Sequence, residues 1–98
     1  MAIPKISVSV EMLDGNEYDD MRVISADLIR HSEVAKRHNW GSLEEDPMRA
    51  QIFMGYAAMT RLGNYPSDRG FDDFVNECAG VAADFGDGED LDPTPAAT

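Results

Sequence analysis

The two histidines are the first candidates for metal chemistry. His31 and His38 are seven residues apart, which places them on one face of a helix but two turns from each other. A single zinc ion cannot reach both side chains without a bend in the helix, and no third ligand follows at a matching spacing. We therefore interpret both as surface or half-buried residues and predict no metal site at them.

The single cysteine, Cys78, is the candidate for thiol chemistry. It cannot form a disulfide within the chain because the sequence has no second cysteine. Cys78 lies among apolar residues at helical spacing and has no obvious base beside it, and burial in such surroundings raises the pKa of a thiol. We interpret it as a small core residue.

Acidic residues near the C-terminus could collect calcium weakly. Phe85, however, stands where an EF-hand loop needs an oxygen ligand, and Gly86 and Gly88 lie among acids that would repel a phosphate. Because none of these groups forms a catalytic constellation, the sequence predicts a protein that is not an enzyme and needs no cofactor. Solvated charge is our interpretation of Asp84, Asp87, Glu89, Asp90 and Asp92.

Composition excludes several classes of partner. The chain has 98 residues, with 8 Lys and Arg against 19 Asp and Glu, for a net charge of -11. Phosphate backbones and anionic membranes repel such a chain, so we expect no nucleic-acid or membrane partner. No apolar run has the length of a signal peptide or a membrane span, which predicts a cytoplasmic protein.

The charge is unevenly distributed along the chain. The residues after Gly70 carry eight acids and no base. Residues 83–98 are rich in Gly, Asp, Pro and Ala, and Phe85 and Leu91 are their only large apolar groups, too few to offset the entropy of ordering this stretch. We predict one domain over residues 1–82 and a disordered acidic tail over 83–98.

A β-hairpin opens the predicted domain. Apolar and polar residues alternate from Ile6 to Met12, and Asp14-Gly15-Asn16 supplies residues that tolerate a tight turn. The second strand should cover residues 17–24. Its alternation is poor because Asp19 and Asp20 are adjacent, which is typical of an edge strand with a bulge.

Three helices should follow the hairpin. Ser25 can cap the first, which would end at Asn39-Trp40-Gly41. Asp46 and Pro47 are the start signals of a second, which Arg61 and Gly63 would end. The third is indicated by the helical spacing of Phe71, Phe74, Val75, Cys78 and Ala82. The predicted fold is therefore α+β, with the hairpin packed on a small bundle of about three helices.

The second helix carries the residues that we consider for binding a partner. Methionines are soft and adaptable, and small residues such as Gly55 and Ala58 allow another helix to approach closely. A hydrophobic central helix is also what a three-helix domain needs for its core, and Trp40 is either a lid on that core or an exposed hot spot. The candidate partner-binding residues are Met48, Met54, Tyr56, Met59 and Trp40.

Several segments, taken in order, carry a family resemblance. They are Leu13-Asp14-Gly15-Asn16-Glu17, Asp27-Leu28-Ile29, Lys36-Arg37-His38-Asn39-Trp40, Pro47, the run from Ala57 to Gly63, Phe71-x-x-Phe74 with Cys78 and Val81, and Asp92-Pro93-Thr94. In this order, over nearly the whole chain, the sequence resembles the small tail assembly chaperones of actinobacterial siphophages. It departs from the family's pattern in the second strand, where relatives alternate more cleanly.

The resemblance implies a non-enzymatic protein made in the host cytoplasm. Such a chaperone holds the long tape measure protein soluble while tail-tube subunits assemble around it, and it is often made in short and frameshift-extended forms. The implied partners are the tape measure protein and the tail-tube protein, and a homo-oligomer is left open.

Two other functions remain open at this stage. A structural head-tail or tail-terminator subunit of the virion has the same size and fold class. An acidic DNA mimic that blocks a host DNA-binding protein would instead use its carboxylates in place of phosphates. Mimicry requires rows of acids on folded structure, whereas five of the nineteen acids lie in the predicted tail.

Overall fold

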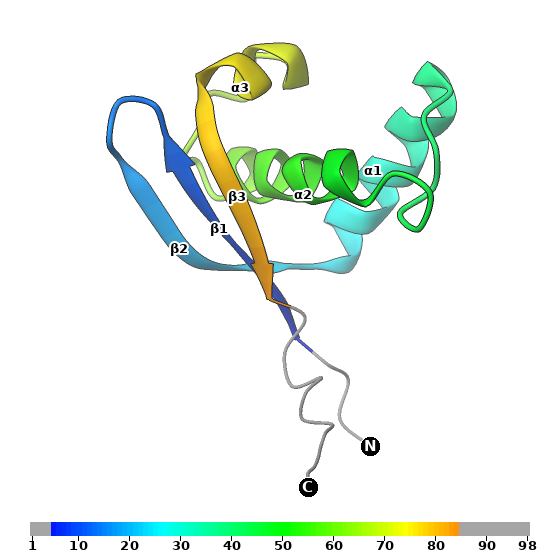
Figure 1. Cartoon of the computed structure of the whole chain (residues 1–98), viewed down its shortest axis with the longest axis horizontal. Coiled ribbons are helices and arrows are strands. Elements are labelled where there is room, and N and C mark those ends of the chain that lie inside the picture. The colour runs from blue at the N-terminus through cyan, green and yellow to red at the C-terminus, as the bar shows by residue number, and fades with distance from the viewer. Residues whose placement is uncertain (1–4, 85–98) are drawn as a thin grey trace, which may run out of the picture.

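The computed structural model describes residues 5–84 and confirms the α+β class. Ala83 and Asp84 end a strand, so the folded part extends past residue 82, and the rest of the predicted tail lies outside the described residues. The elements, in chain order, are β1 (Ile6–Met12), β2 (Glu17–Val23), α1 (Ser25–His38), α2 (Pro47–Arg61), α3 (Phe71–Glu77) and β3 (Cys78–Asp84) (Figure 1).

The hairpin of β1 and β2 forms as predicted. Gly15 adopts a φ of 97°, and the backbone N–H of Asn16 donates to the Asp14 carboxylate at 2.9 Å, which closes the turn. The register shifts between Val8 and Val10 of β1, and Asp20 of β2 has a φ of 55° at this point. The predicted bulge in β2 is therefore confirmed, and β2 is an edge strand.

The third helix of the prediction is wrong beyond Glu77. From Cys78 the chain continues as β3, which pairs antiparallel with β1 and completes a sheet in the order β2-β1-β3. Val81 and Ala83 are both half-buried, with exposed Ala82 between them, so the segment follows the period of a strand. Pairing with β1 overrides the local helical spacing, and Gly80 adds little helix propensity to oppose it.

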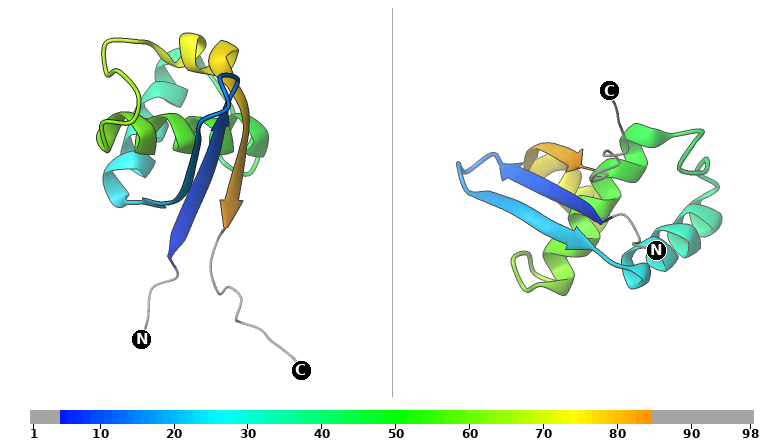
Figure 2. Two further views of the ribbon diagram at one scale, coloured as in Figure 1. Left: turned by 90° about the vertical axis from the view of Figure 1, so that its left-hand side faces the viewer. Right: turned by 90° about the horizontal axis from the view of Figure 1, so that it is seen from below.

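One helix, α2, lies across the sheet and contacts all three strands. α1 and α3 pack on α2, and α1 lies beside it rather than against the sheet (Figure 2). At Gly55 of α2, an added Cβ would meet side-chain carbons of Val10 and Val81 at 3.0 Å. The missing side chain therefore lets α2 lie close to β1 and β3, rather than to a partner helix.

The first turn of α1 is held by an acid and not by Ser25. Ile24 is the N-cap residue, and its backbone N–H donates to the Asp27 carboxylate at 3.0 Å. Asp27 is only 2% exposed and forms an ion pair with Arg61 at 3.1 Å. This pair ties the start of α1 to the end of α2.

An aromatic cluster runs through the core and includes two rings of α2. Its rings contact one another at centroid separations of 5.2 to 6.3 Å, and they join α1 and the following loop to α3. Aromatic contacts of this kind add to the stabilisation that burial provides. The members are His31, Trp40, Phe53, Tyr56, Tyr65, Phe71 and Phe74.

The α3 end of the aromatic cluster is closed by a polar network. The Tyr65 hydroxyl donates to the Glu77 carboxylate at 3.0 Å and accepts from Arg69 Nε at 3.2 Å. Arg69 also forms an ion pair with Glu77. Burial raises the pKa of the Tyr65 hydroxyl above its ordinary value. The Tyr65 hydroxyl therefore has both an acceptor and a donor as partners.

Candidate functional site

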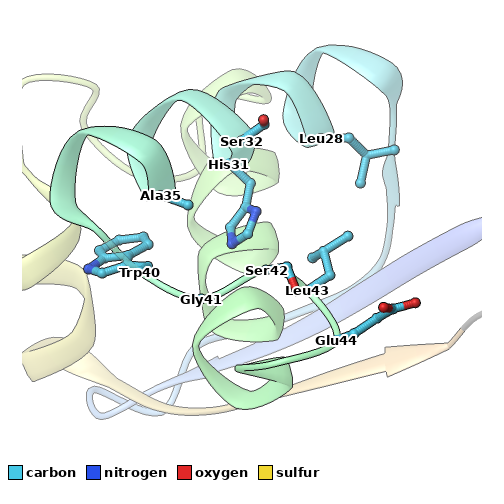
Figure 3. A pocket seen from close by; sticks show the side chains of 9 residues that line it. All are labelled: Leu28, His31, Ser32, Ala35, Trp40, Gly41, Ser42, Leu43 and Glu44. Carbon is cyan, nitrogen blue, oxygen red and sulfur yellow. The ribbon is translucent and has the colours of Figure 1, made fainter.

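A cleft lies between α1 and the loop that joins α1 to α2. It has a volume of about 500 Å³ and is open to solvent along one side. Figure 3 shows His31 projecting from α1 into this space, toward the loop, with Trp40 at one end and Leu28 and Leu43 at the other. The lining residues are Leu28, His31, Ser32, Ala35, Trp40, Gly41, Ser42, Leu43 and Glu44.

The loop opposite α1 is fixed by local hydrogen bonds. Asn39 ends α1 with a φ of 59°, and the Trp40 N–H donates to the Ala35 carbonyl at 2.8 Å. The loop contains a capping box: Ser42 N–H donates to Glu45 Oε1 at 2.9 Å, and Glu45 N–H donates to Ser42 Oγ at 3.2 Å. One wall of the cleft is therefore held in place by hydrogen bonds within the loop and by the bond from Trp40 to the last turn of α1.

The start of α2 is also as predicted. Asp46 is the N-cap residue, and its carboxylate accepts from the Arg49 N–H at 3.4 Å, with Pro47 in the first turn. This cap sets the direction in which the loop enters α2.

A second, apolar cavity adjoins the cleft. It has a volume of about 170 Å³ and lies between the sheet, α1 and α2. Leu28 and Leu43 line both hollows, so these two side chains form the wall between them. Leu43 is 46% exposed and Leu28 is 36% exposed. The remaining lining residues are Ile6, Val8, Val23, Pro47, Ala50, Gln51, Met54 and Ala83.

His31 is the polar residue at the base of the cleft. The sequence predicts a surface or half-buried histidine, but the side chain is buried, at 4% exposure, against Trp40 and Phe53. No group in residues 5–84 forms a hydrogen bond with either ring nitrogen. Burial lowers the pKa of His31 below its ordinary value, and the charge of Asp46 opposes this shift in part.

Trp40 closes one end of the cleft. It packs on Phe53 and Phe71, with ring centroids 6.0 and 5.3 Å away, while His38 stacks on it at 5.5 Å. The Arg49 guanidinium lies 5.2 Å from the ring centroid. Trp40 thus covers the core and also presents part of its ring to the cleft.

The five predicted partner-binding residues do not form one surface. Tyr56 and Met59 are buried core residues, because α2 is covered by the sheet on one side and by α1 and α3 on others. Met54, predicted as a groove residue, is also buried, although it lines the apolar cavity. Trp40 lines the cleft, and Met48 is 75% exposed beside a separate shallow groove with Ile52, Phe71 and Val75.

The prediction did not include Leu28, His31 or Leu43 among the site residues. Leu28, His31 and Ala35 follow one another at intervals of three and four residues, which is the spacing of one helix face. This stripe predicts that α1 presents an apolar face. The sequence contains no comparable signal for Leu43, whose place depends on how the loop folds back.

Other kinds of site find no support in the described part of the chain. Within residues 5–84, no group of three or more His, Cys, Asp or Glu side chains is placed to hold a metal ion. No helix over the same range combines the length and the apolar character needed to cross a membrane. Cys78 is half-buried, and burial raises the pKa of its thiol.

Comparisons of the chain with protein families, with curated proteins and with solved structures find no match.

Proposed function

We propose that this protein is a non-enzymatic phage tail assembly chaperone that binds the tape measure protein in the host cytoplasm. The observation that carries the proposal is the pair of hollows that share Leu28 and Leu43, two large apolar side chains exposed at the rim. Exposed apolar surface with a hollow behind it is typical of a binding site for a protein segment. The resemblance of the sequence to siphophage tail assembly chaperones supports the same function.

Such a chaperone needs two properties. A client rich in apolar helical surface requires an apolar groove, which the cleft and the cavity provide. The complex must also stay in solution, and a net charge of -11 on a chain of 98 residues favours this. Tail-tube protein would then assemble around the client as the chaperone leaves.

Co-expression with the tape measure protein of the same phage tests the proposal. Leu28→Asp and Leu43→Asp should each reduce co-purification of the tape measure protein, because a carboxylate in the apolar wall must be desolvated when the client binds. Leu13→Asp and Leu62→Asp are matched controls, since both leucines are exposed and neither lines the hollows. Circular dichroism should be unchanged in all four variants.

Different outcomes would identify other surfaces or functions. If only Met48→Asp abolishes co-purification, the client binds the groove between α2 and α3 instead of the cleft. If the tape measure protein does not bind the wild-type chain at all, the proposal is wrong. Mass spectrometry of purified virions separates the main alternative, since a structural subunit is retained in the particle and a chaperone is not.

A further inference from the structure

His31 has an unmet capacity for hydrogen bonding at the base of the cleft. Its side chain is nine-tenths buried or more, it projects toward the open space, and neither ring nitrogen has a hydrogen-bond partner in residues 5–84 (Figure 3). Buried polar groups in proteins are nearly always paired, and an unpaired one destabilises the structure. A ligand that supplies a partner at this point therefore binds more tightly than one that does not.

The chemistry of the imidazole restricts what that partner can be. Burial keeps the ring neutral near pH 7, so one nitrogen donates and the other accepts. A carboxylate only accepts hydrogen bonds and an ammonium group only donates them, so either would leave one ring nitrogen of the neutral imidazole without a partner. A neutral group that can both donate and accept fits this position.

The walls of the cleft indicate what must carry that group. Leu28, Ala35 and Leu43 form an apolar channel of about 500 Å³ with Trp40 at its end, which exceeds the volume of a single side chain and suits one face of a helix. A hydroxyl, one bond from Cβ, would remain near the rim, whereas a carboxamide on a longer stem reaches past the two leucines. Glu44 at the rim and the net charge of -11 favour basic residues on the flanks of that helix.

We infer that the cleft binds an amphipathic helix that inserts a glutamine or asparagine side chain against His31. This rests on the proposed function, because the helix then belongs to the tape measure protein. The apolar face provides contact with Leu28 and Leu43, and the carboxamide selects among apolar helices by pairing with the imidazole. His31 is thus a specificity-determining residue of the site.

A selection experiment tests this inference without the tape measure protein. Helical peptides with lysines on the outer face, randomised at positions i, i+3, i+4 and i+7 of the inner face, are selected on the full chain and on its His31→Phe variant. The wild-type chain should enrich Gln or Asn at one inner position, and the variant should enrich Leu or Met there. Enrichment of apolar residues alone on both chains, or no enrichment on the wild-type chain, would overturn the inference.

Affinity measurements on a selected peptide give the size of the effect. Trp40, the single tryptophan of the chain, lines the cleft and reports occupancy by its fluorescence. The Gln peptide should bind the wild-type chain about tenfold more tightly than its Gln→Leu counterpart, the factor expected for one hydrogen bond to an otherwise unpaired buried group. The preference should vanish with His31→Phe, whose ring packs on Trp40 and Phe53 in the same place.

A measurement on the wild-type chain keeps the test independent of the variant's folding. The ring ¹⁵N shifts of His31 should move when the Gln peptide binds and should stay in place with the Leu peptide. Equal shifts with both peptides would contradict the inference.

Failure of the inference and failure of the proposed function give different results. If the peptide preference is found but the tape measure protein does not co-purify, the cleft has this specificity and the client is another protein. If the tape measure protein co-purifies in a Leu43-dependent manner and His31→Phe leaves both binding and peptide preference unchanged, the function stands and the role of His31 is wrong.

Discussion

A polar ring is buried at each end of the aromatic cluster, and the two rings differ in their hydrogen bonding. At the α3 end, Tyr65 is 6% exposed and its hydroxyl is paired with both Arg69 and Glu77. At the α1 end, His31 is buried to a similar extent, and its ring nitrogens have no partner within residues 5–84. The same core therefore ends in a satisfied polar network on one side and in an open cleft on the other.

This difference separates a structural role from a binding role. The hydrogen bonds of Tyr65 are all used within the domain, so they hold α3 and the loop before it against the core. The ring nitrogens of His31 form no hydrogen bond within residues 5–84, so they can contribute binding free energy when a ligand in the cleft pairs with them. Loss of the polar group should accordingly destabilise the fold at the Tyr65 end and should not destabilise it at the His31 end.

The largest expected effect is the loss of stability when a buried charged group loses its partner. Arg61→Met leaves the nearly inaccessible Asp27 carboxylate without its counter-ion. We expect a loss of about 3 kcal/mol in the free energy of unfolding, measured by urea denaturation. Arg37→Met, at an exposed position of α1, is the control and should change stability by less than about 0.5 kcal/mol. Equal effects of the two variants would show that the Asp27 pair contributes nothing.

A smaller loss is expected at the satisfied end of the cluster. Tyr65→Phe removes a hydroxyl that donates to Glu77 and accepts from Arg69, while these two residues still pair with each other. The unfolding free energy should fall by about 1 kcal/mol, which lowers the melting temperature by roughly 4–8 °C in a domain of this size. An unchanged melting temperature would contradict the structural role of the network.

At the open end, removal of the polar ring should not destabilise the fold. His31→Phe replaces an unpaired imidazole by an apolar ring of similar shape between Trp40 and Phe53. We expect the unfolding free energy to rise slightly or to stay within about 0.5 kcal/mol of wild type, in contrast to the loss expected for Tyr65→Phe. Thermal denaturation of the two variants side by side gives the comparison. A clear loss of stability in His31→Phe would mean that the imidazole is paired after all.

The contribution of His31 to the stability of the fold should depend on pH. Because burial lowers the pKa of His31 in the folded state, the unfolded state binds more protons as the pH falls through the unfolded value of about 6.5. The stability of the wild-type chain should therefore decline between neutral pH and pH 5, relative to His31→Phe. The difference between the two denaturation curves isolates this residue from the acids of the chain. A difference that grows toward higher pH would contradict the shift.

The sequence predicts the elements whose signals are local. The turn at Gly15, the bulge near Asp20 and the cap at Asp46 all depend on residues within a few positions of one another. The third strand was missed because residues 71–82 fit a helix by spacing, whereas β3 forms only through pairing with β1 at the other end of the chain. Signals from neighbouring residues do not predict pairing with a strand so distant in the sequence.

The candidate site was predicted less well than the fold, for a related reason. Trp40 is one of the predicted partner-binding residues, and it lines the cleft. Met59 and Tyr56 resemble groove residues in the sequence, but the sheet and two helices cover α2 and bury them. His31 has the same local sequence whether it is exposed or buried, and its burial depends on Trp40 and Phe53. Burial of this kind is a property of the assembled core.

The central position of β1 has a consequence for synthesis on the ribosome. β1 is the first described element to be made, and one of its two neighbours, β3, is the last. The hairpin can form early, but the nascent chain must wait with one edge of β1 unpaired until Asp84 has left the exit tunnel. Closing so long a loop slows the final step of folding. A chain released before residue 78 would present that edge to other nascent chains, so completion of the sheet also protects against aggregation.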